Sequence, residues 1–193
     1  MILIVYCHPY VHSFNHAELV TIERRLTQLH QRFDVIDLYA DHFDPTYSAH
    51  ELSLYHDGKT DDPLVEKYLG LFHQASSVIF ITPIWWNSVP GMLKGFIDKV
   101  MKEGSGLSHT VTRFGIHGQL QNIQDCYVLT TSTSPTFYLR YFCGNAVKHV
   151  FMNTTLKQLG FQHRHWQNFG GITTSSAKRR RRYLARLSQQ RFE

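Results

Sequence analysis

Short apolar runs that alternate with segments of helical periodicity are the feature that most restricts the fold of this chain. The first run, Met1 to Cys7, is continuous and rich in β-branched residues, which is typical of a strand buried on both faces. After it, apolar residues recur every three or four positions from Leu19 to Phe33, which predicts a helix that begins at Ser13. This order of elements indicates an α/β fold, a doubly wound parallel sheet with helices on both faces.

The same alternation continues along the chain. Further strands are predicted at 35–38, 77–82, 126–131 and 163–169, and further helices at 64–75, 90–102 and 145–159. Within the helix at 90–102, Asp98 is expected to pair with Lys102 one turn on. Parallel sheets of this kind bind ligands at the carboxyl ends of the strands, where the strand order reverses. The segments just after each strand are therefore the candidate site.

Length and composition indicate one globular domain, residues 1–193, with 42% hydrophobic and 18% charged residues. No run of about 18 apolar residues occurs, so no membrane span is predicted. The start, MILIVYCHPY, lacks the basic region of a signal peptide and is interpreted as a strand. Cys7, Cys126 and Cys143 form no CxxC pair and are expected to be buried free thiols, which favours the reducing cytoplasm.

Much of the net charge of +5 comes from one run, KRRRR at 178–182. Tyr183, Leu184 and Leu187, which follow it, are predicted to form the apolar stripe of a last helix. The simplest interpretation of the basic run is a solvated helix face. The alternative is a docking surface for an acidic partner, a lipid headgroup or a nucleotide phosphate. No nucleic-acid motif or aromatic interleaving accompanies the run, so no nucleic-acid binding is expected.

The segment after the first strand, His8 to Glu18, contains no glycine, since the first glycine of the chain is Gly58. A Walker loop and a GxGxxG fingerprint are therefore excluded, because both need glycine for close backbone approach. Ser13 and Asn15 are good N-cap residues, and a helix start offers free N–H groups to an anion. A plain helix cap is the alternative interpretation of this segment.

The segment after the third strand contains two adjacent tryptophans, Trp85 and Trp86, between Pro83 and Pro90. One of them is expected to be a core or interface residue. Two together at the end of a strand also fit a planar ligand, which proteins hold by aromatic walls and a few N–H groups.

Histidine is frequent, with 13 residues, but no metal site is predicted. His12 and His16 could share a helix face, and His163 and His165 alternate on a strand. Neither pair has a third ligand at a recognisable spacing, so ordinary hydrogen-bonded histidines are favoured.

Four segments carry a resemblance to a known family. They are ILIVYCHPYVHSFNHA, PIWWNSVPGMLKGFIDKV, DLYADHFDP and VLTTSTSP. Up to about Gly171 the chain resembles the flavodoxin-like NAD(P)H:quinone oxidoreductases, which include the DT-diaphorases, the modulator-of-drug-activity reductases and the potassium-efflux ancillary reductases. The resemblance implies a five-stranded sheet in the order 2-1-3-4-5, a non-covalently bound flavin (FMN or FAD) and a homodimer with each flavin at the subunit interface.

The resemblance also implies which residues bind the cofactor. The phosphate loop falls on His8, Ser13, Phe14 and Asn15. The segment that holds the isoalloxazine ring falls on Pro83, Ile84, Trp85, Trp86 and Asn87. Trp86 takes the position of the aromatic wall, which leaves Trp85 as the packing residue. The third segment is Thr130, Thr131, Ser132 and Thr133, where the family has Thr-Thr-Gly-Gly. Because Ser132 and Thr133 adopt positive φ poorly, the backbone contact there is expected to be reshaped.

The implied chemistry is hydride transfer from NAD(P)H through the flavin to a quinone-like acceptor, in two alternating half-reactions. Tyr138, with the N–H groups of Ser132 and Thr133, is the candidate for stabilising charge on the reduced ring. The histidine that accompanies this tyrosine in some relatives is replaced by Gly144, so a Tyr–His proton relay is not expected.

Two other functions stay open from the sequence. A one-electron carrier of the flavodoxin type is disfavoured, because such carriers are acidic and this chain is basic. A regulatory flavoprotein subunit of a membrane potassium-efflux system is compatible with the resemblance and would make the protein a peripheral membrane partner. The basic run and Arg140 would then be the docking candidates. Neither the choice between FMN and FAD nor that between NADH and NADPH is readable from the residues.

Overall fold

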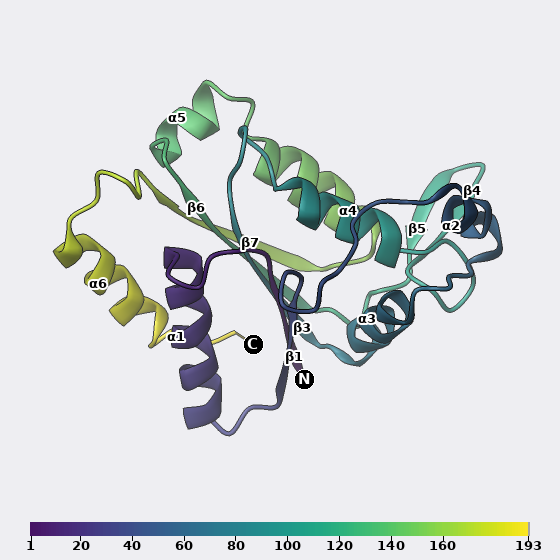
Figure 1. Ribbon diagram of the computed structural model, residues 1–193, viewed down its shortest axis with the longest axis horizontal. Helices are drawn as coiled ribbons and strands as arrows, with labels where there is room; N and C mark the ends of the chain where they lie inside the picture. Colours follow the sequence, from purple (N-terminus) through teal and green to yellow (C-terminus); the bar gives the residue numbers. More distant parts are fainter. Residues whose placement is uncertain (193) are drawn as a thin grey trace.

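The computed structural model describes residues 1–192 and contains a five-stranded parallel sheet (Figure 1). The strands are β1 (Ile2–Tyr6), β2 (Phe33–Asp37), β3 (Ser77–Pro83), β6 (Asp125–Ser132) and β7 (His163–Gly170). They lie in the order β2-β1-β3-β6-β7, and all neighbouring pairs are parallel. Numbered among themselves, these strands have the order 2-1-3-4-5, so the predicted fold class is confirmed.

Helices cover both faces of the sheet. Helices α1 (Phe14–Gln28) and α6 (Ala177–Leu187) lie on one face; α3 (Pro63–Gln74), α4 (Gly91–Val100) and the π-helix η2 (Val147–Leu156) lie on the other. Residues of β1 alternate between the two cores, with Ile2 and Ile4 facing α1 and Leu3 and Val5 facing the opposite helices. The predicted stripe of α6 is confirmed, because Leu187 is buried in the same core as Ile2.

Side-chain caps fix where the helices begin. The Ser13 hydroxyl accepts the His16 N–H at the start of α1, and Asp62 accepts the Leu64 N–H at the start of α3. Helix α4 begins at Gly91, one residue later than predicted, because Pro90 is its N-cap and not its first residue. Since α1 directly follows β1, its first-turn N–H groups point to the carboxyl edge of the sheet.

The sequence patterns missed the shorter elements. These are α2 (Ala49–Ser53), the 3₁₀ turn η1 (Tyr55–Asp57), α5 (Thr136–Tyr141) and a hairpin of β4 (His109–Thr112) and β5 (Gly115–Gly118). Their residues are mostly exposed, so they carry little of the apolar periodicity that revealed the longer elements.

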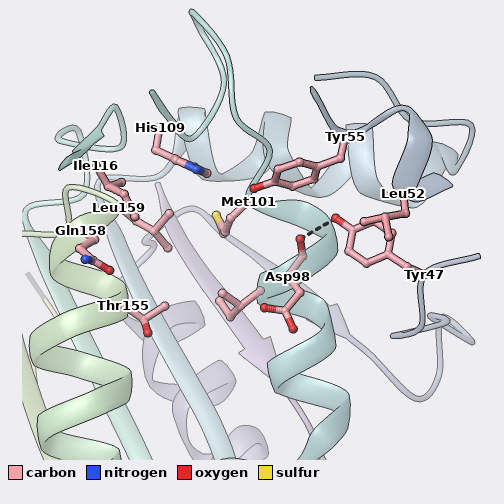
Figure 2. A pocket seen from close by; sticks show the side chains of 11 residues that line it. Tyr47, Leu52, Tyr55, Asp98, Met101, His109, Ile116, Thr155, Gln158 and Leu159 are labelled. Carbon is pink, nitrogen blue, oxygen red and sulfur yellow. Dashed lines mark hydrogen bonds between the residues drawn. The ribbon is translucent and has the colours of Figure 1, made fainter. Parts of the chain in front are cut away.

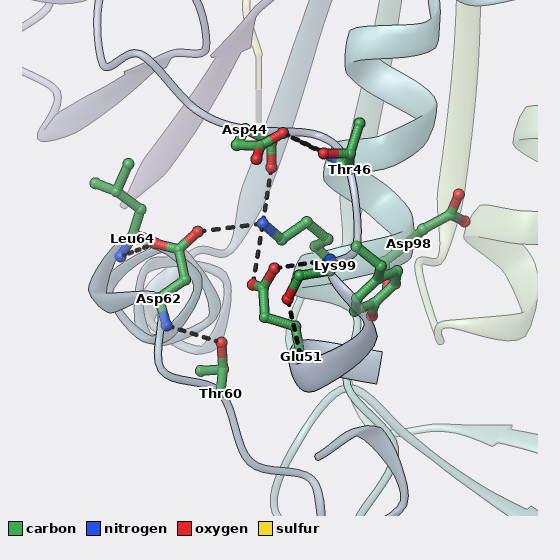
Figure 3. A network of polar contacts seen from close by, with 10 residues as sticks. Asp44, Thr46, Glu51, Thr60, Asp62, Leu64, Asp98 and Lys99 are labelled. Atoms are coloured by element: carbon green, nitrogen blue, oxygen red, sulfur yellow. Dashed lines mark hydrogen bonds and ion pairs between the residues drawn. The ribbon is translucent and has the colours of Figure 1, made fainter. Parts of the chain in front are cut away.

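The polar segment between β2 and α3 is anchored by a buried lysine, Lys99 of α4 (Figure 3). Its Nζ donates to the Asp44 carbonyl at 2.8 Å and pairs with Glu51 Oε1 at 3.1 Å and Asp62 Oδ2 at 3.4 Å. Asp62 also caps α3, so one carboxylate joins two helices. This network holds a stretch without a strand against the body of the fold.

Two details differ from expectation. Asp98 pairs with Lys94, not with Lys102, because Lys102 is buried with its Nζ over the rings of Tyr47 and Tyr55. Cys7 and Cys126 are buried as predicted, whereas Cys143 is only partly buried. Within residues 1–192, no helix combines the length and the apolar character needed to cross a membrane.

Candidate functional site

The loops that follow β1, β3 and β6 meet at the carboxyl edge of the sheet. The Ile84 N–H donates to the Thr131 carbonyl at 2.7 Å, which joins the second loop to the end of β6. The Thr131 hydroxyl donates to Asn15 Oδ1 at 2.7 Å, which joins β6 to the start of α1. The structure thus brings together the three segments that the sequence assigned to one site.

The first loop presents an unpaired helix start. Ser13 Oγ accepts the His16 N–H at 3.1 Å, but in residues 1–192 the N–H groups of Phe14 and Asn15 have no protein acceptor. His8 stands at the other end of the same loop, where its Nδ1 accepts the Tyr10 N–H at 3.0 Å and burial lowers its pKa. Two free donors at the positive end of a helix suit an anion such as a phosphate.

The second loop is a tight turn. Trp85 and Ser88 exchange backbone hydrogen bonds of 3.0 and 3.1 Å, and the two residues between them are left-handed, with φ of 50° for Trp86 and 65° for Asn87. These angles define a type I′ turn, which usually contains glycine or asparagine. A tryptophan at positive φ is strained, and strain of this kind concentrates at functional sites. Across the described chain, neither central N–H has a protein acceptor.

The two tryptophans do not divide as predicted. Trp86 is 98% exposed at the tip of the turn, so its ring is available to a ligand or to another surface. Trp85 is 43% exposed and lies edge-on to His8, with ring centroids 6.3 Å apart. The interpretation of Trp85 as a core packing residue is therefore wrong. It is instead the first residue of the turn, and its ring reaches His8 of the first loop.

The third loop is held by Asn168 of β7. Asn168 Oδ1 accepts the Thr130 hydroxyl at 2.9 Å, and its Nδ2 donates to Ser132 Oγ at 3.0 Å and Thr136 Oγ1 at 2.9 Å. Neither Ser132 nor Thr133 has positive φ, so this backbone differs from a glycine loop as expected. The Thr133 N–H has no protein acceptor among residues 1–192 and is available to a ligand.

A cavity of about 300 Å³ opens between the second and third loops. It is lined by Ile84, Trp86, Asn87, Ser132, Thr133, Ser134, Tyr138, Leu139 and Cys143. Tyr138 of α5 is partly exposed and stacks on Phe142 with centroids 5.7 Å apart. Five of the predicted residues and the candidate catalytic tyrosine therefore share one cavity.

A second cavity, of about 380 Å³, lies away from these loops (Figure 2). It is bounded by the last turn of α4, the segment that holds Tyr47 and Tyr55, the hairpin and the end of η2. Helix α4 starts at the carboxyl edge, just after the turn that contains Trp86, and runs away from that edge. Met101, which lines this cavity, lies at the opposite end of the helix. None of the predicted site residues lines it.

Three residues that shape the site were missed. Asn168 organises the third loop, Trp166 Nε1 donates to Thr130 Oγ1 at 2.8 Å, and Glu18 accepts the Asn15 amide at 2.9 Å. Asn168 and Trp166 stand on a strand paired in register with β6, so a register prediction would have found them. Glu18 carried no signal, because a glutamate inside a helix is unremarkable in sequence. Within the described residues, no three His, Cys, Asp or Glu side chains are grouped to hold a metal ion.

Comparison with known proteins agrees with this geometry. A family model described as a flavodoxin-like fold matches residues 1–190. An uncharacterized NAD(P)H oxidoreductase of Haemophilus influenzae is 26% identical over 192 residues, covering 97% of this chain and 92% of the relative. A ribosyldihydronicotinamide dehydrogenase (quinone) of Mus musculus is 26% identical over 211 residues, covering 97% and 89%. The crystal structure of Smu.1420 from Streptococcus mutans UA159 has a TM-score of 0.84 and 31% identity, covering 97% of this chain and 96% of that one. The resemblance read from the motifs is thereby confirmed.

Proposed function

Because the chain belongs to the family of the flavodoxin-like fold, we propose that it is a flavin-dependent NAD(P)H oxidoreductase that reduces quinones or related electrophiles. One observation carries the proposal. The second and third loops present unpaired N–H groups to a 300 Å³ cavity flanked by an exposed tryptophan, and the first loop, joined to the third by the Thr131–Asn15 hydrogen bond, adds an unpaired helix start. Relatives named as NAD(P)H oxidoreductase and quinone dehydrogenase give the reaction class.

The residues present fit a flavin. The free N–H groups of Phe14 and Asn15 would bind its phosphate, while those of Trp86, Asn87 and Thr133 would bind the polar edge of its ring. When bound, the flavin supplies hydride acceptance from a nicotinamide and hydride donation to an electron-poor acceptor. The chain itself orients the ring and offers N–H groups, with the Tyr138 hydroxyl, to negative charge at the edge of the cavity.

The space next to the first loop bears on the choice of flavin. A cavity of about 430 Å³ between α1 and α6 is lined by Ser13, His12, His16, Arg24 and Leu184, among others. It continues from the helix start and carries basic side chains, so it would receive the adenosine monophosphate part that FAD has beyond FMN. FMN would leave it open. Acid denaturation of the purified protein, followed by identification of the released flavin, decides between the two.

A homodimer is the second part of the proposal. Trp86 and four aromatic residues of α5 and its end form an exposed patch beside the site: Phe137, Tyr138, Tyr141 and Phe142. A separate exposed patch on the hairpin contains Val111, Phe114 and Ile116. Clustered exposed apolar side chains mark an interaction site. In a two-fold dimer, the aromatic patch of each subunit could pack on the hairpin patch of the other, so the same contact would occur twice. Phe114→Asp is expected to convert a dimer to a monomer in analytical ultracentrifugation.

Steady-state kinetics test the reaction. If one cavity beside Trp86 serves both substrates, NAD(P)H and quinone should exclude each other and give parallel double-reciprocal lines. Intersecting lines would contradict the single-cavity arrangement. Reduction of the purified protein by NAD(P)H without a partner reductase distinguishes an oxidoreductase from a one-electron carrier. The regulatory-subunit alternative would instead be supported by co-purification with a membrane protein.

A further inference from the structure

Glu18 is the buried ionisable group that the proposed reaction leaves unexplained. Its side chain is completely buried in α1, and no lysine, arginine or histidine of the described chain pairs with it. Oε2 accepts the Asn15 amide at 2.9 Å, whereas Oε1 has no hydrogen-bond partner among residues 1–192. A buried carboxylate without a cation is costly, so such a group is expected to keep its proton.

The carboxyl ends a directed chain of hydrogen bonds. The Thr131 hydroxyl donates to Asn15 Oδ1 at 2.7 Å, and Asn15 Nδ2 donates to Glu18 Oε2 at 2.9 Å. Because both ends of the Asn15 amide are used, its side chain has one orientation. Glu18 therefore fixes the residue whose N–H is one of the two free donors at the start of α1.

The groups that face Glu18 come from three elements. Asn15 lies on α1 itself, Tyr6 on β1 and Tyr183 on α6. The Tyr183 hydroxyl approaches the carboxyl, but it makes no hydrogen bond of standard geometry. Tyr183 also packs against Phe14, with centroids 5.7 Å apart, and this contact ties α6 to the same helix start. Burial raises the pKa of Glu18 to about 8 and raises the pKa of Tyr183 as well.

Position along the helix links this group to the anion site. Glu18 stands five residues after the N-cap Ser13, which is about 7–8 Å along the axis at 1.5 Å per residue. A negative charge this close to the start of α1 would partly cancel the positive end of the helix dipole, and it would repel a phosphate bound at the first turn. The neutral acid has neither effect.

We propose that Glu18 is a positioning residue that holds the start of α1 ready for a cofactor phosphate while it is protonated, and that its ionisation weakens the binding of phosphorylated flavins. This inference rests on the proposed function, because it needs a flavin phosphate at Phe14 and Asn15. It adds a dependence on pH that the backbone donors alone would not produce.

Binding titrations with FMN, FAD and riboflavin between pH 7 and pH 9 test the proposal on apo protein. If a bound phosphate raises the pKa of Glu18 by one further unit, the Kd of the phosphorylated flavin rises about fivefold over this range. Riboflavin, which lacks the phosphate, should bind with a Kd that changes less than about twofold. In Glu18→Gln the amide keeps an acceptor for Asn15, so the phosphorylated flavin should bind with a Kd that is nearly constant. Glu66→Gln on α3 is the matched control and should keep the fivefold change.

Each outcome separates the two proposals. Failure of the wild-type protein to bind any flavin overturns the proposed function. Flavin binding with a pH-independent Kd, or an unchanged pH dependence in Glu18→Gln, overturns the role of Glu18 and leaves the proposed function standing. An equal dependence for riboflavin and FMN would mean that ionisation loosens the fold and does not act on the phosphate, which also overturns the proposal. If Glu18→Gln does not fold, the comparison of FMN with riboflavin on wild-type protein still decides.

Discussion

Two buried ionisable side chains, one on each face of the sheet, are held in opposite ways. On the face covered by α3 and α4, Lys99 has two carboxylates and a carbonyl within 3.4 Å. On the face covered by α1 and α6, Glu18 has one amide donor and no cation among the described residues. A buried charge persists when it is paired and hydrogen-bonded, and otherwise the group becomes neutral. The first face thus gains an anchor, and the second gains a group whose protonation changes near neutral pH.

The pH dependence of stability would sharpen this comparison most. Glu18 has a pKa of about 8 in the folded protein, against about 4.3 for glutamate in an unfolded chain. The folded state therefore keeps this proton to a higher pH than the unfolded chain does. The contribution of Glu18 to stability is full below the pKa of the unfolded chain and is lost as the pH rises through about 8. The wild-type free energy of unfolding should therefore fall relative to Glu18→Gln by about 4–5 kcal/mol between pH 4 and pH 9.

Urea denaturation of both proteins at several pH values measures this difference. Glu66→Gln, on the exposed surface of α3, is the control and should follow the wild type. Parallel curves for wild type and Glu18→Gln would mean that the carboxyl is charged in the folded state, and the contrast with Lys99 would disappear.

Removal of the buried lysine Lys99 is expected to give the next largest loss of stability. Lys99→Met removes the cation between Glu51 and Asp62 and leaves two carboxylates facing each other with a carbonyl, so the fold should lose about 3 kcal/mol. The loss is at the lower end of the range for buried pairs, because both carboxylates keep some contact with solvent. Urea denaturation at pH 7 gives the value, and a loss below about 1 kcal/mol would show that solvent already screens this network.

Burial explains why the long helices and strands were predictable from the sequence and why the short elements were not. Strands such as β3, buried over all of its length, and helices such as α3 must carry apolar residues at fixed periods. The hairpin from His109 to Gly118 is mostly exposed, so it does not need apolar residues at a fixed period. The loops after β1, β3 and β6 meet at the carboxyl edge as predicted, because they follow directly from strand ends. Their internal links were not predicted, since the contact between Thr131 and Asn15 spans 116 residues.

The tryptophan turn shows the same limit at a single residue. Adjacent tryptophans indicated one buried and one ligand-facing ring, whereas the structure exposes both to different extents. The type I′ turn was not foreseen, because Trp-Asn lacks the glycine that usually identifies it. Local sequence therefore predicted the position of this loop in the fold better than its conformation.

Substitution of the tryptophans should separate function from stability. Trp86→Gly removes an exposed ring from a left-handed position, so stability should rise by about 0.5–1 kcal/mol while flavin or quinone binding weakens several-fold. Trp85→Ala removes a partly exposed ring, so it should lower the free energy of unfolding by about 1–2 kcal/mol, less than the loss of a core tryptophan would. Thermal unfolding and turnover per bound flavin measure the two effects. Unchanged turnover in Trp86→Gly would assign that ring to an interface alone.

The smallest effect is expected for the ion pair of Lys94 and Asp98, which lies on the exposed face of the helix that carries Lys99. Both side chains are largely solvated, and their spacing of one helical turn is the arrangement that contributes about 0.3–0.5 kcal/mol. Lys94→Met should therefore change stability by no more than this, and added salt should reduce the difference further. Lys99→Met removes the same charge from the same helix at a position shielded from solvent, and its effect should persist in salt. A loss from Lys94→Met equal to that from Lys99→Met would show that burial does not set the strength of these pairs.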